Sequence, residues 1–311
     1  MKIVVVGLGG VGGIVGGRLA AGLSDSPGHE VIFWCRGKVL DAILEKGLDI
    51  LGNDGKITVR PALATCNVAD IEEPDLLIFA TKGYHLEHAA RELAPSVTSK
   101  TAAISLLNGV SAASTLGECL PKGDVLEGCI YISAHVEKPG TVRQIGAVQR
   151  IFFGKKGISE AENRVRYGNI EQVLKKAGLN ATLTERIDVE VWSKFIFLSP
   201  FAGVTTLFRR SIGEVLSEGG SFEIVNKMVR EIEELARAKN IDLPGSIADI
   251  TIEKARSFAP STKTSMQLDQ EQGRSTELES LIGYVCQEGK ALGIPVPAYE
   301  SVYNDLKVIC K

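Results

Sequence analysis

The chain has 311 residues, of which 44% are hydrophobic and 23% are charged. This length corresponds to about two domains of ordinary size, and the balance is that of a globular protein. The formal net charge of −3 leaves no basic surplus, so nucleic acid is not expected as a partner.

Cysteine usage and the N-terminal run bear on the compartment. The six cysteines form no C-x-x-C pair, which is typical of buried thiols in a reduced, cytoplasmic compartment. Lys2 followed by an apolar run resembles a signal peptide, and Gly9, Gly13 and Gly17 fit a membrane G-x-x-x-G pattern. Arg18 and the many glycines favour a strand, a glycine loop and a helix instead, so we expect no membrane association.

His85 and His88 are one helical turn apart, a spacing that can hold a metal ion. No further His or Cys lies nearby in the sequence to complete a set of ligands. We therefore expect a solvated helix face at this position and no metal site in the chain.

Apolar, β-branched runs alternate with helical patterns in the first half of the chain. The strands are expected at 2–6, 30–35, 75–81, 101–107 and 180–184, with β-like segments within 57–65. The helices are expected at 10–23, 38–46, 84–94, 110–119 and 159–177. This alternation predicts a parallel, doubly wound sheet, to which residues 125–153 add antiparallel strands.

The strand pattern stops near residue 185. Helices are expected at 187–207, 211–217, 221–239, 245–258, 274–292 and 297–309. The chain thus predicts an α/β Rossmann-type domain over residues 1–184 and a separate all-α domain over residues 185–311. A cleft between such domains is the default ligand site. The helical half also offers a surface for a homodimer, although no heptad seam indicates one.

Residues 7–12 read GLGGVG and form a G-x-G-x-x-G motif. Gly7 would make the tight turn, Gly9 would let the backbone approach a pyrophosphate, and Gly12 would let helix and strand pack closely. The same loop includes Leu8, Gly10 and Val11. The alternative is a merely glycine-rich turn, but the motif follows a strand and opens a helix, which is the context of a dinucleotide site.

Arg36 directly follows the second expected strand, EVIFWC. NAD sites carry Asp or Glu near this point for the ribose 2′-hydroxyl, whereas Arg accommodates a 2′-phosphate. The residue therefore predicts NADP(H) as the cofactor. The competing interpretation is an ordinary surface arginine.

Lys82 and Asn108 each follow an expected strand, at the edge of the sheet where open α/β folds bind ligands. Lys82 is a candidate for a phosphate or ribose contact. Asn108 is a candidate for contact with ribose, nicotinamide or substrate. The alternatives are a solvated lysine and an Asn-Gly turn.

Residues 191–207, VWSKFIFLSPFAGVTTL, contain a single charge, Lys194. Lysine is rarely buried without a partner because desolvating an ammonium is costly. Two interpretations are open: the side chain extends out of a core helix, or the protein needs a cation in an apolar cleft.

Several motifs together resemble the ketopantoate reductase (2-dehydropantoate 2-reductase) family, in order and nearly from end to end. They are GLGGVGG, the lysine of ATKG, the asparagine of LLNGV, WSKF and TSMQLDQEQGRSTELESLIGYV. The resemblance implies a Rossmann domain, a helical domain and NADPH, with hydride reducing the C2 ketone of a 2-oxo acid to give D-pantoate, a step of pantothenate and coenzyme A biosynthesis.

The resemblance also implies roles for single residues. Lys194 matches the catalytic lysine, and Glu277 matches the acidic residue that contacts the cofactor and orders the site. Ser265 matches a serine that holds the substrate. Lys82 and Asn108 match cofactor contacts, with Asn108 also touching substrate. The chemistry agrees, because a positioned cation stabilises the charge on the ketone oxygen and can donate the proton.

The chain departs from the family where many members carry substrate-binding asparagines. Those positions hold Leu198, Ala202 and Ile212. The nearby polar residues are Ser199, Thr205 and Thr206. Missing amides leave the identity of the 2-oxo acid open. The alternatives are a paralogous 2-oxo-acid reductase, a 3-hydroxy-acid enzyme of the 6-phosphogluconate type, and a non-catalytic NADP(H)-sensing protein.

Overall fold

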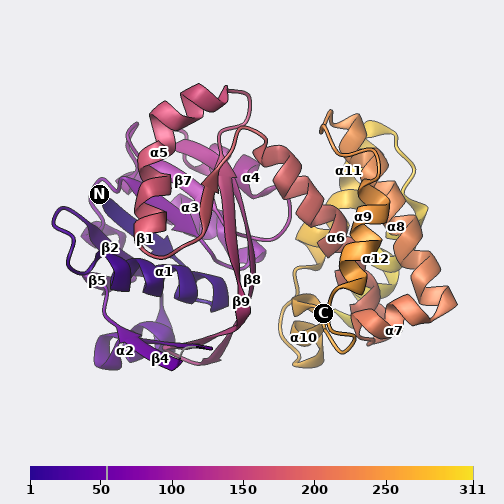
Figure 1. The fold of residues 1–311 in the computed structure, drawn as a ribbon, viewed down its shortest axis with the longest axis horizontal. Helices are drawn as coiled ribbons and strands as arrows, with labels where there is room; N and C mark the ends of the chain where they lie inside the picture. Colours follow the sequence, from indigo (N-terminus) through magenta and orange to yellow (C-terminus); the bar gives the residue numbers. More distant parts are fainter. Residues whose placement is uncertain (54, 311) are drawn as a thin grey trace. The chain divides into compact units, whose positions relative to one another are not determined.

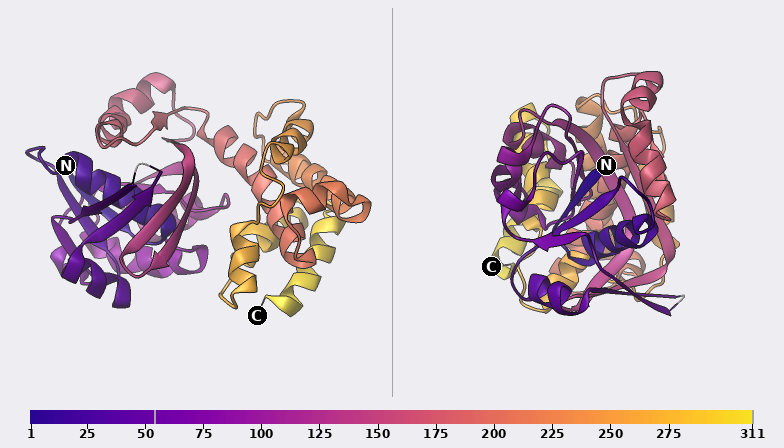
Figure 2. Two further views of the ribbon diagram at one scale, coloured as in Figure 1. Left: turned by 60° about the horizontal axis from the view of Figure 1, so that its bottom comes forward. Right: turned by 90° about the vertical axis from the view of Figure 1, so that its left-hand side faces the viewer.

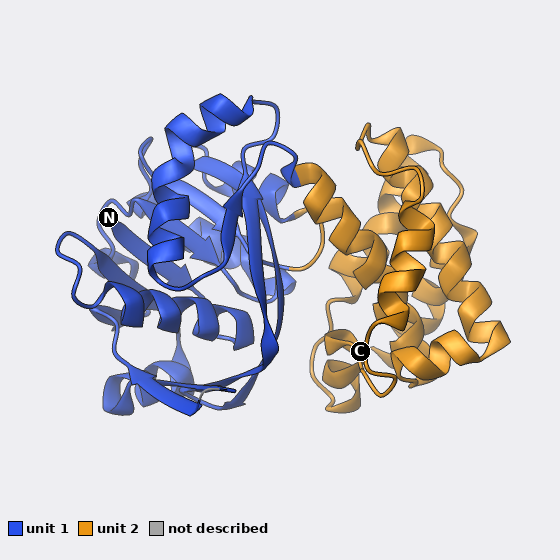
Figure 3. Cartoon of the chain, viewed as in Figure 1, with its two compact units in different colours: residues 1–107, 112–187 blue, residues 108–111, 188–311 orange. Residues whose placement is uncertain are grey.

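The computed structural model describes residues 1–53 and 55–310 (Figure 1, with two further views in Figure 2). The chain divides into two compact units (Figure 3). Unit 1 comprises residues 1–107 and 112–187, and unit 2 comprises residues 108–111 and 188–311. The chain therefore enters unit 2 twice, first as a short segment and then for all of the remainder.

Unit 1 is built on a sheet that has ten strands in the described residues. Five of them pair in parallel in the order β7-β6-β1-β2-β5. They are β1 (Lys2–Val6), β2 (Glu30–Trp34), β5 (Leu63–Thr65), β6 (Leu76–Phe79) and β7 (Ala102–Ser105). This order is that of a doubly wound sheet, in which the chain moves outward on both sides of β1.

The sheet continues beyond β7 in the order β8-β9-β3-β4, and β10 lies beside β9. These strands are β3 (Leu48–Gly52), β4 (Gly55–Val59), β8 (Asp124–Lys138), β9 (Thr141–Gly154) and β10 (Ala181–Leu183). The long pair β8-β9 is antiparallel, as the sequence predicts for residues 125–153.

Helices cover both faces of this sheet. They are α1 (Gly10–Leu23), α2 (Gly37–Lys46), α3 (Leu86–Leu93), α4 (Ala112–Cys119) and α5 (Glu160–Lys176). Strand β1 shows why two layers are needed, since successive side chains of a strand point to opposite faces. Ile3 and Val5 share a buried cluster with residues of α1, whereas Val4 and Val6 share one with residues of α3 and α4. All four are 0% exposed, as in a parallel sheet covered on both sides.

The β-like segments expected over 57–65 correspond to the end of β4 and to β5. Pro61 separates β4 from β5, because proline has no N–H to donate to a ladder. The sequence does not predict β3. Its parallel partner is β9, with Asp49 opposite Thr141, so the pairing that makes it a strand lies far along the chain.

Unit 2 is helical. Its helices are α6 (Ile187–Phe208), α7 (Ile212–Ser217), α8 (Gly219–Ala238), α9 (Ile247–Arg256), α10 (Ser265–Glu271), α11 (Tyr284–Leu292) and α12 (Pro297–Ile309). The predicted Rossmann-type sheet followed by a separate all-α domain is confirmed.

Two details of unit 2 differ from the prediction. The sequence does not predict α10, and the helix expected over 274–292 begins only after Glu277, with a π-helical turn at Glu279–Gly283. Gly273 explains the break, because it adopts φ +64° directly after the C-cap of α10, a conformation that suits glycine and ends a helix.

Helix α6 is the apolar helix of the unit 2 core. By length and composition it could also cross a membrane, but 72% of its most apolar window is buried inside the chain. Its residues Phe195, Ile196, Phe201 and Val204 are at most 1% exposed and belong to one large cluster with the other helices of unit 2. A helix that is apolar all round is expected at such a buried position.

Candidate active site

The glycine loop between β1 and α1 has the geometry of a phosphate cradle. Gly7 adopts φ +90°, and a Cβ there would lie 2.8 Å from Cγ2 of Thr81. A Cβ on Gly12 would lie 1.9 Å from the carbonyl oxygen of Gly7, so no larger residue fits without moving the loop. A Cβ on Gly9, by contrast, would meet nothing within 4 Å among the described residues. The loop is thus tight toward the protein and open at Gly9.

The N-terminus of α1 is suited to an anion. Gly9 is its N-cap, no described side chain caps it, and no acidic residue lies in its first turn. The first N–H groups of a helix have no partner inside the helix and lie at the positive end of its dipole. The residues present therefore fit a pyrophosphate group at this position.

Other glycines of α1 let the helix lie close to the sheet of unit 1. A Cβ on Gly10 would be 2.6 Å from the oxygen of Ala134 in β8, and a Cβ on Gly13 would be 2.5 Å from Val142 in β9. A Cβ on Gly17 would be 2.2 Å from Ile50 in β3. The membrane-like glycine spacing is thus explained by helix–sheet packing.

Lys82 follows β6, the strand that pairs with β1 next to the glycine loop. Strands β1 and β6 are parallel, with Val6 opposite Phe79, so both continue beyond the sheet at the same edge. Lys82 is half-buried and is the N-cap of the short 3-10 helix Gly83–His85. The structure therefore places it at the carboxyl edge that the sequence predicts.

Arg36 lies at the N-cap of α2, where its guanidinium already has partners. Its central carbon lies 4.5 Å from the centre of the Trp34 ring. Its Nη2 also donates to the Glu92 carboxylate of α3. Burial raises the pKa of the adjacent Cys35 thiol to about 12, so this cysteine is uncharged at neutral pH. The sequence gives no signal of Glu92, which is 56 residues away from Arg36.

Three predicted residues meet in unit 2. Nζ of Lys194 donates to Oδ1 of Asn108 at 2.9 Å, and Nδ2 of Asn108 donates to Oε2 of Glu277 at 3.3 Å. Glu277 is 6% exposed, and the other two residues are half-buried. One amide thus joins a cation to a carboxylate, with its oxygen toward the donor and its nitrogen toward the acceptor.

The local backbone brings these residues together. Asn108 follows β7 and belongs to the segment 108–111, whose Val110 packs against the unit 2 core. Gly109 adopts φ +93°, and a Cβ there would be 3.2 Å from the oxygen of Ser280. The chain bends at Asn108 and Gly109, and this bend sets the direction of the Asn108 amide. The contact of Asn108 with cofactor or substrate stays a prediction.

Ser265 is not part of this hydrogen-bonded chain. It is the exposed first residue of α10, whose N-cap Thr264 accepts from the N–H of Gln267. The structure does not bring it into contact with the Asn108 amide that joins Lys194 to Glu277.

The three positions without asparagine are largely core positions of unit 2. Ala202 is 0% and Ile212 is 3% exposed, and Leu198 is half-buried against the same cluster. These side chains offer no hydrogen bonds, which agrees with an apolar surrounding for this part of α6.

The neighbouring hydroxyls have internal partners. Ser199 donates to the oxygen of Leu281, and its hydroxyl is also hydrogen-bonded to the Tyr299 hydroxyl, both at 2.9 Å. Thr205 is 2.8 Å from the Thr264 hydroxyl. Only the Thr206 hydroxyl is buried without a hydrogen-bond partner among these, within the part of the chain that the structure describes. Ser199 and Thr205 therefore do not replace the missing amides.

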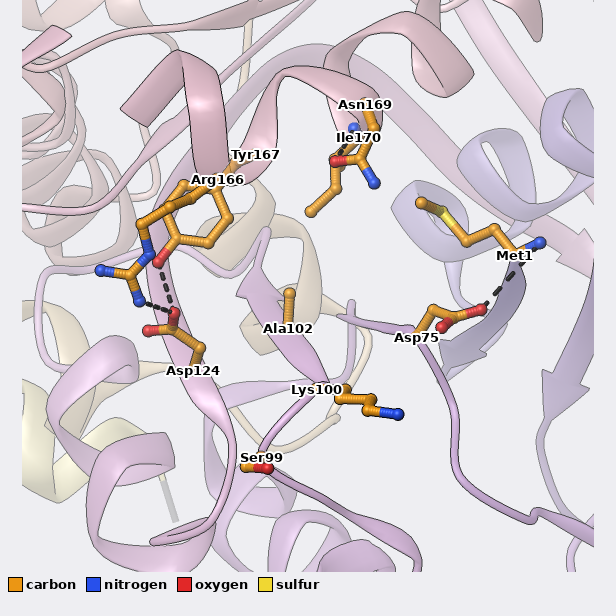
Figure 4. A pocket seen from close by; sticks show the side chains of 10 residues that line it. All are labelled: Met1, Asp75, Ser99, Lys100, Ala102, Asp124, Arg166, Tyr167, Asn169 and Ile170. Atoms are coloured by element: carbon orange, nitrogen blue, oxygen red, sulfur yellow. Dashed lines mark hydrogen bonds and ion pairs between the residues drawn. The ribbon is translucent and has the colours of Figure 1, made fainter. Parts of the chain in front are cut away.

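A cavity of about 300 Å³ in unit 1 lies apart from the glycine loop (Figure 4). Its lining includes Met1, Asp75 and Ala102, at the amino ends of parallel strands. There Asp124 accepts hydrogen bonds from Tyr167 and Arg166. Open α/β sheets bind ligands at the opposite, carboxyl ends, so this cavity is not part of the candidate site.

Family models match both units. One described as ketopantoate reductase PanE/ApbA matches residues 3–157, and one described as its C-terminal part matches residues 186–309. The chain belongs to the ketopantoate reductase family. This membership confirms the resemblance carried by the glycine loop, WSKF and the 264–285 stretch.

Similar proteins span the whole chain. The uncharacterized oxidoreductase YkpB of Bacillus subtilis is 28% identical over 308 residues, which are 99% of this chain and 98% of the relative. A 2-dehydropantoate 2-reductase of Halobacterium salinarum is also 28% identical over 308 residues, with 97% and 96% covered. The crystal structure of 2-dehydropantoate 2-reductase from Porphyromonas gingivalis is 30% identical, with a TM-score of 0.86 and 99% of each chain covered. The chain is thus an oxidoreductase of this family.

Proposed function

We propose that this protein uses NADPH to reduce a 2-oxo acid to a 2-hydroxy acid, with 2-dehydropantoate (ketopantoate) as the first substrate to test. The observation that carries the proposal is the chain of hydrogen bonds from Lys194 through Asn108 to Glu277. Two relatives named 2-dehydropantoate 2-reductase support the choice of substrate. D-Pantoate, the product, would serve pantothenate and coenzyme A biosynthesis.

The cofactor would bind to residues of the first domain, 1–184. The open backbone at Gly9 and the N-terminus of α1 would hold the pyrophosphate, and Arg36 would bind the 2′-phosphate. Lys82 extends from the neighbouring strand edge and would contact phosphate or ribose. When bound, the reduced nicotinamide supplies the hydride.

The second domain, 185–311, would supply the proton through Lys194. As charge develops on the substrate carbonyl oxygen, the ammonium stabilises it and transfers a proton from Nζ to that oxygen. Oδ1 of Asn108 accepts one of the three ammonium hydrogens, which fixes the direction of the remaining two. A proton from the solvent then restores the ammonium, so the overall reduction consumes one proton.

Glu277 would act by fixing the Asn108 amide. Its carboxylate can only accept, so it holds the amide nitrogen and leaves the amide oxygen for Lys194. If the amide were turned over, its NH₂ group would face the ammonium and repel it. In this proposal Asn108 and Glu277 also contact the cofactor, and Asn108 and Ser265 contact the substrate.

The test of the lysine is Lys194→Ala. We expect kcat for NADPH oxidation with ketopantoate to fall by roughly a hundredfold or more, the scale of general acid catalysis. The Kd of NADPH, measured by fluorescence titration, should change less than about twofold, or below about 0.4 kcal/mol. Lys227→Ala is the matched control, because Lys227 is an exposed lysine of the same unit that pairs with Glu223. Unchanged turnover in Lys194→Ala would contradict the proposal.

A substrate panel separates the alternatives. NADPH oxidation would be measured with ketopantoate and with 2-oxo acids of other side chains, and NADP⁺ reduction with 3-hydroxy acids. Preference for another 2-oxo acid would identify a paralogue, and turnover of 3-hydroxy acids alone would favour the 6-phosphogluconate type. NADPH binding without turnover of any compound would favour the sensing protein.

A further inference from the structure

Arg36 is held between an aromatic ring and a carboxylate. The ring is Trp34, which lies in a buried cluster with residues of α3, including Ala89 and Leu93. The carboxylate is Glu92 of the same helix, which forms an ion pair with the guanidinium. The side chains of Arg36 and Glu92 are 46% and 30% exposed, so both charged groups are partly open to solvent.

A second side chain, His88, also lies near the Glu92 carboxylate. Nε2 of His88 lies 3.5 Å from its Oε2, one helical turn away on α3. The carboxylate thus has Arg36 as one neighbour and His88 as the other. The sequence favours a solvated helix face for His88 over a metal site, and the side chain is 74% exposed.

A carboxylate at this position bears on which nucleotide can bind. The 2′-phosphate of NADPH is a phosphate monoester with about −1.5 to −2 charges at pH 7. A guanidinium presents a fork of N–H groups that suits one carboxylate or phosphate in a bidentate manner. With Glu92 on Nη2, the phosphate must displace the carboxylate or bind beside a like charge. NADH has a neutral 2′-hydroxyl there and meets no such repulsion.

We propose that Glu92 is a specificity-determining residue that weakens the preference for a 2′-phosphate by competing for Arg36. Glu92 acts through Arg36 and is in this sense a positioning residue. The inference rests on the proposed function, in which Arg36 binds the 2′-phosphate. It goes further, because it makes the choice between NADPH and NADH depend on a helix that no dinucleotide motif includes.

The test is Glu92→Gln, which keeps the size of the side chain and removes its charge. Binding of 2′,5′-ADP and of 5′-ADP would be measured by titration calorimetry at pH 7.5 and low salt. We expect 2′,5′-ADP to bind about fivefold more tightly, or about 1 kcal/mol, while the affinity for 5′-ADP changes less than about twofold. A merely structural role of Glu92 would move both ligands together.

Glu87→Gln is the matched control. Glu87 lies on the same helix, is exposed and pairs with Arg91 instead of Arg36. The same change in net charge there should leave the affinity ratio of 2′,5′-ADP to 5′-ADP as in the parent protein. An equal gain in both variants would mean a general charge effect and would overturn the inference.

Arg36→Ala separates the two proposals. If it weakens 2′,5′-ADP binding by about tenfold while Glu92→Gln has no effect or weakens binding, Arg36 keeps its role and only the inference about Glu92 fails. If Arg36→Ala leaves 2′,5′-ADP binding unchanged, the assignment of Arg36 fails and the inference fails with it.

Discussion

The two units build their candidate sites from different parts of the residue. In unit 1 the glycine loop works through its backbone, because Gly7 and Gly12 leave no room for a Cβ and Gly9 leaves open space. In unit 2 the site consists of side-chain groups, the ammonium, amide and carboxylate of Lys194, Asn108 and Glu277. The backbone site depends on the absence of a Cβ at its glycines. The side-chain site depends on which polar groups the fold places next to one another.

This difference predicts how each site fails. A backbone site should lose stability or ligand affinity when a methyl group is added. Which of the two is lost should depend on the direction in which the new methyl group points. A side-chain site and the buried hydrogen bonds around it should fail when an atom is removed or exchanged at constant size. The following variants test this contrast.

The largest effect is expected for Gly12→Ala, compared with Gly9→Ala. The new Cβ at position 12 would lie 1.9 Å from the oxygen of Gly7, so the loop must move. We expect the free energy of unfolding to fall by about 1–3 kcal/mol, as for overpacking, and the affinity for NADPH to fall by roughly a hundredfold. At Gly9 the methyl group enters open space, so stability should stay while NADPH affinity falls about tenfold.

The measurements are thermal melts and NADPH titrations of both variants. Two alanines that destabilise the protein equally would contradict the comparison, because the loop would then not distinguish its inner side from its open side.

A smaller effect is expected for Thr205→Val, with Thr206→Val as its control. Both changes exchange a hydroxyl for a methyl group in α6 and keep the β-branched shape. Thr205 bonds to Thr264, so valine removes one buried hydrogen bond of the Thr264 hydroxyl, which keeps the one that it accepts from the N–H of Gln267, and the change should cost about 0.5–1.5 kcal/mol. The Thr206 hydroxyl is buried without a partner among the described residues, so valine there should be neutral or stabilise by up to about 1 kcal/mol. Denaturant unfolding of the two variants gives both values, and equal losses would contradict the role of the Thr205 bond.

The smallest effect concerns pH and the N-terminus of α7. Hydrogen bonds from the hydroxyl and the N–H of Ser211, both at 2.7 Å, lower the pKa of Glu214 from its ordinary value of 4.5. A lowered carboxyl pKa gives stability that is present above pH 4.5 and is lost as the pH falls through the lower, folded-state value. We therefore expect the Tm difference between the parent protein and Glu214→Gln to shrink below pH 4.5. A difference that is the same at pH 7 and pH 3 would refute this origin.

The sequence predicts features within one continuous stretch better than contacts between residues that lie far apart along the chain. The glycine loop is one continuous stretch, so its spacing alone indicates the turn and the helix that follows. Glu92, by contrast, reaches Arg36 across 56 residues, and no local pattern marks it. Strand β3 is missed for the same reason, since its partner β9 comes much later in the chain.

The family resemblance predicts which residues form the side-chain site of unit 2, but it does not predict the hydrogen bonds between them. Lys194, Asn108 and Glu277 were each identifiable in the sequence, yet nothing in it indicates that the amide lies between the two charges. The hydroxyls of Ser199 and Thr205 show the same limit. In the sequence they are polar residues beside a candidate site. In the structure Ser199 forms a hydrogen bond with Tyr299, and Thr205 forms one with Thr264.

The segment 108–111 has a consequence for the order in which the protein is made. Asn108 leaves the ribosome long before its partners, since Lys194 follows 86 residues later and Glu277 follows 169 residues later. At about 5–20 residues per second, the carboxylate appears roughly ten to thirty seconds after the amide. Strands β7 and β8, on either side of this segment, can pair during that time. The segment itself cannot form its contacts with unit 2 until the later residues are synthesised. The hydrogen-bonded group of Lys194, Asn108 and Glu277 is thus completed only near the end of translation, after most of the unit 1 sheet has been synthesised.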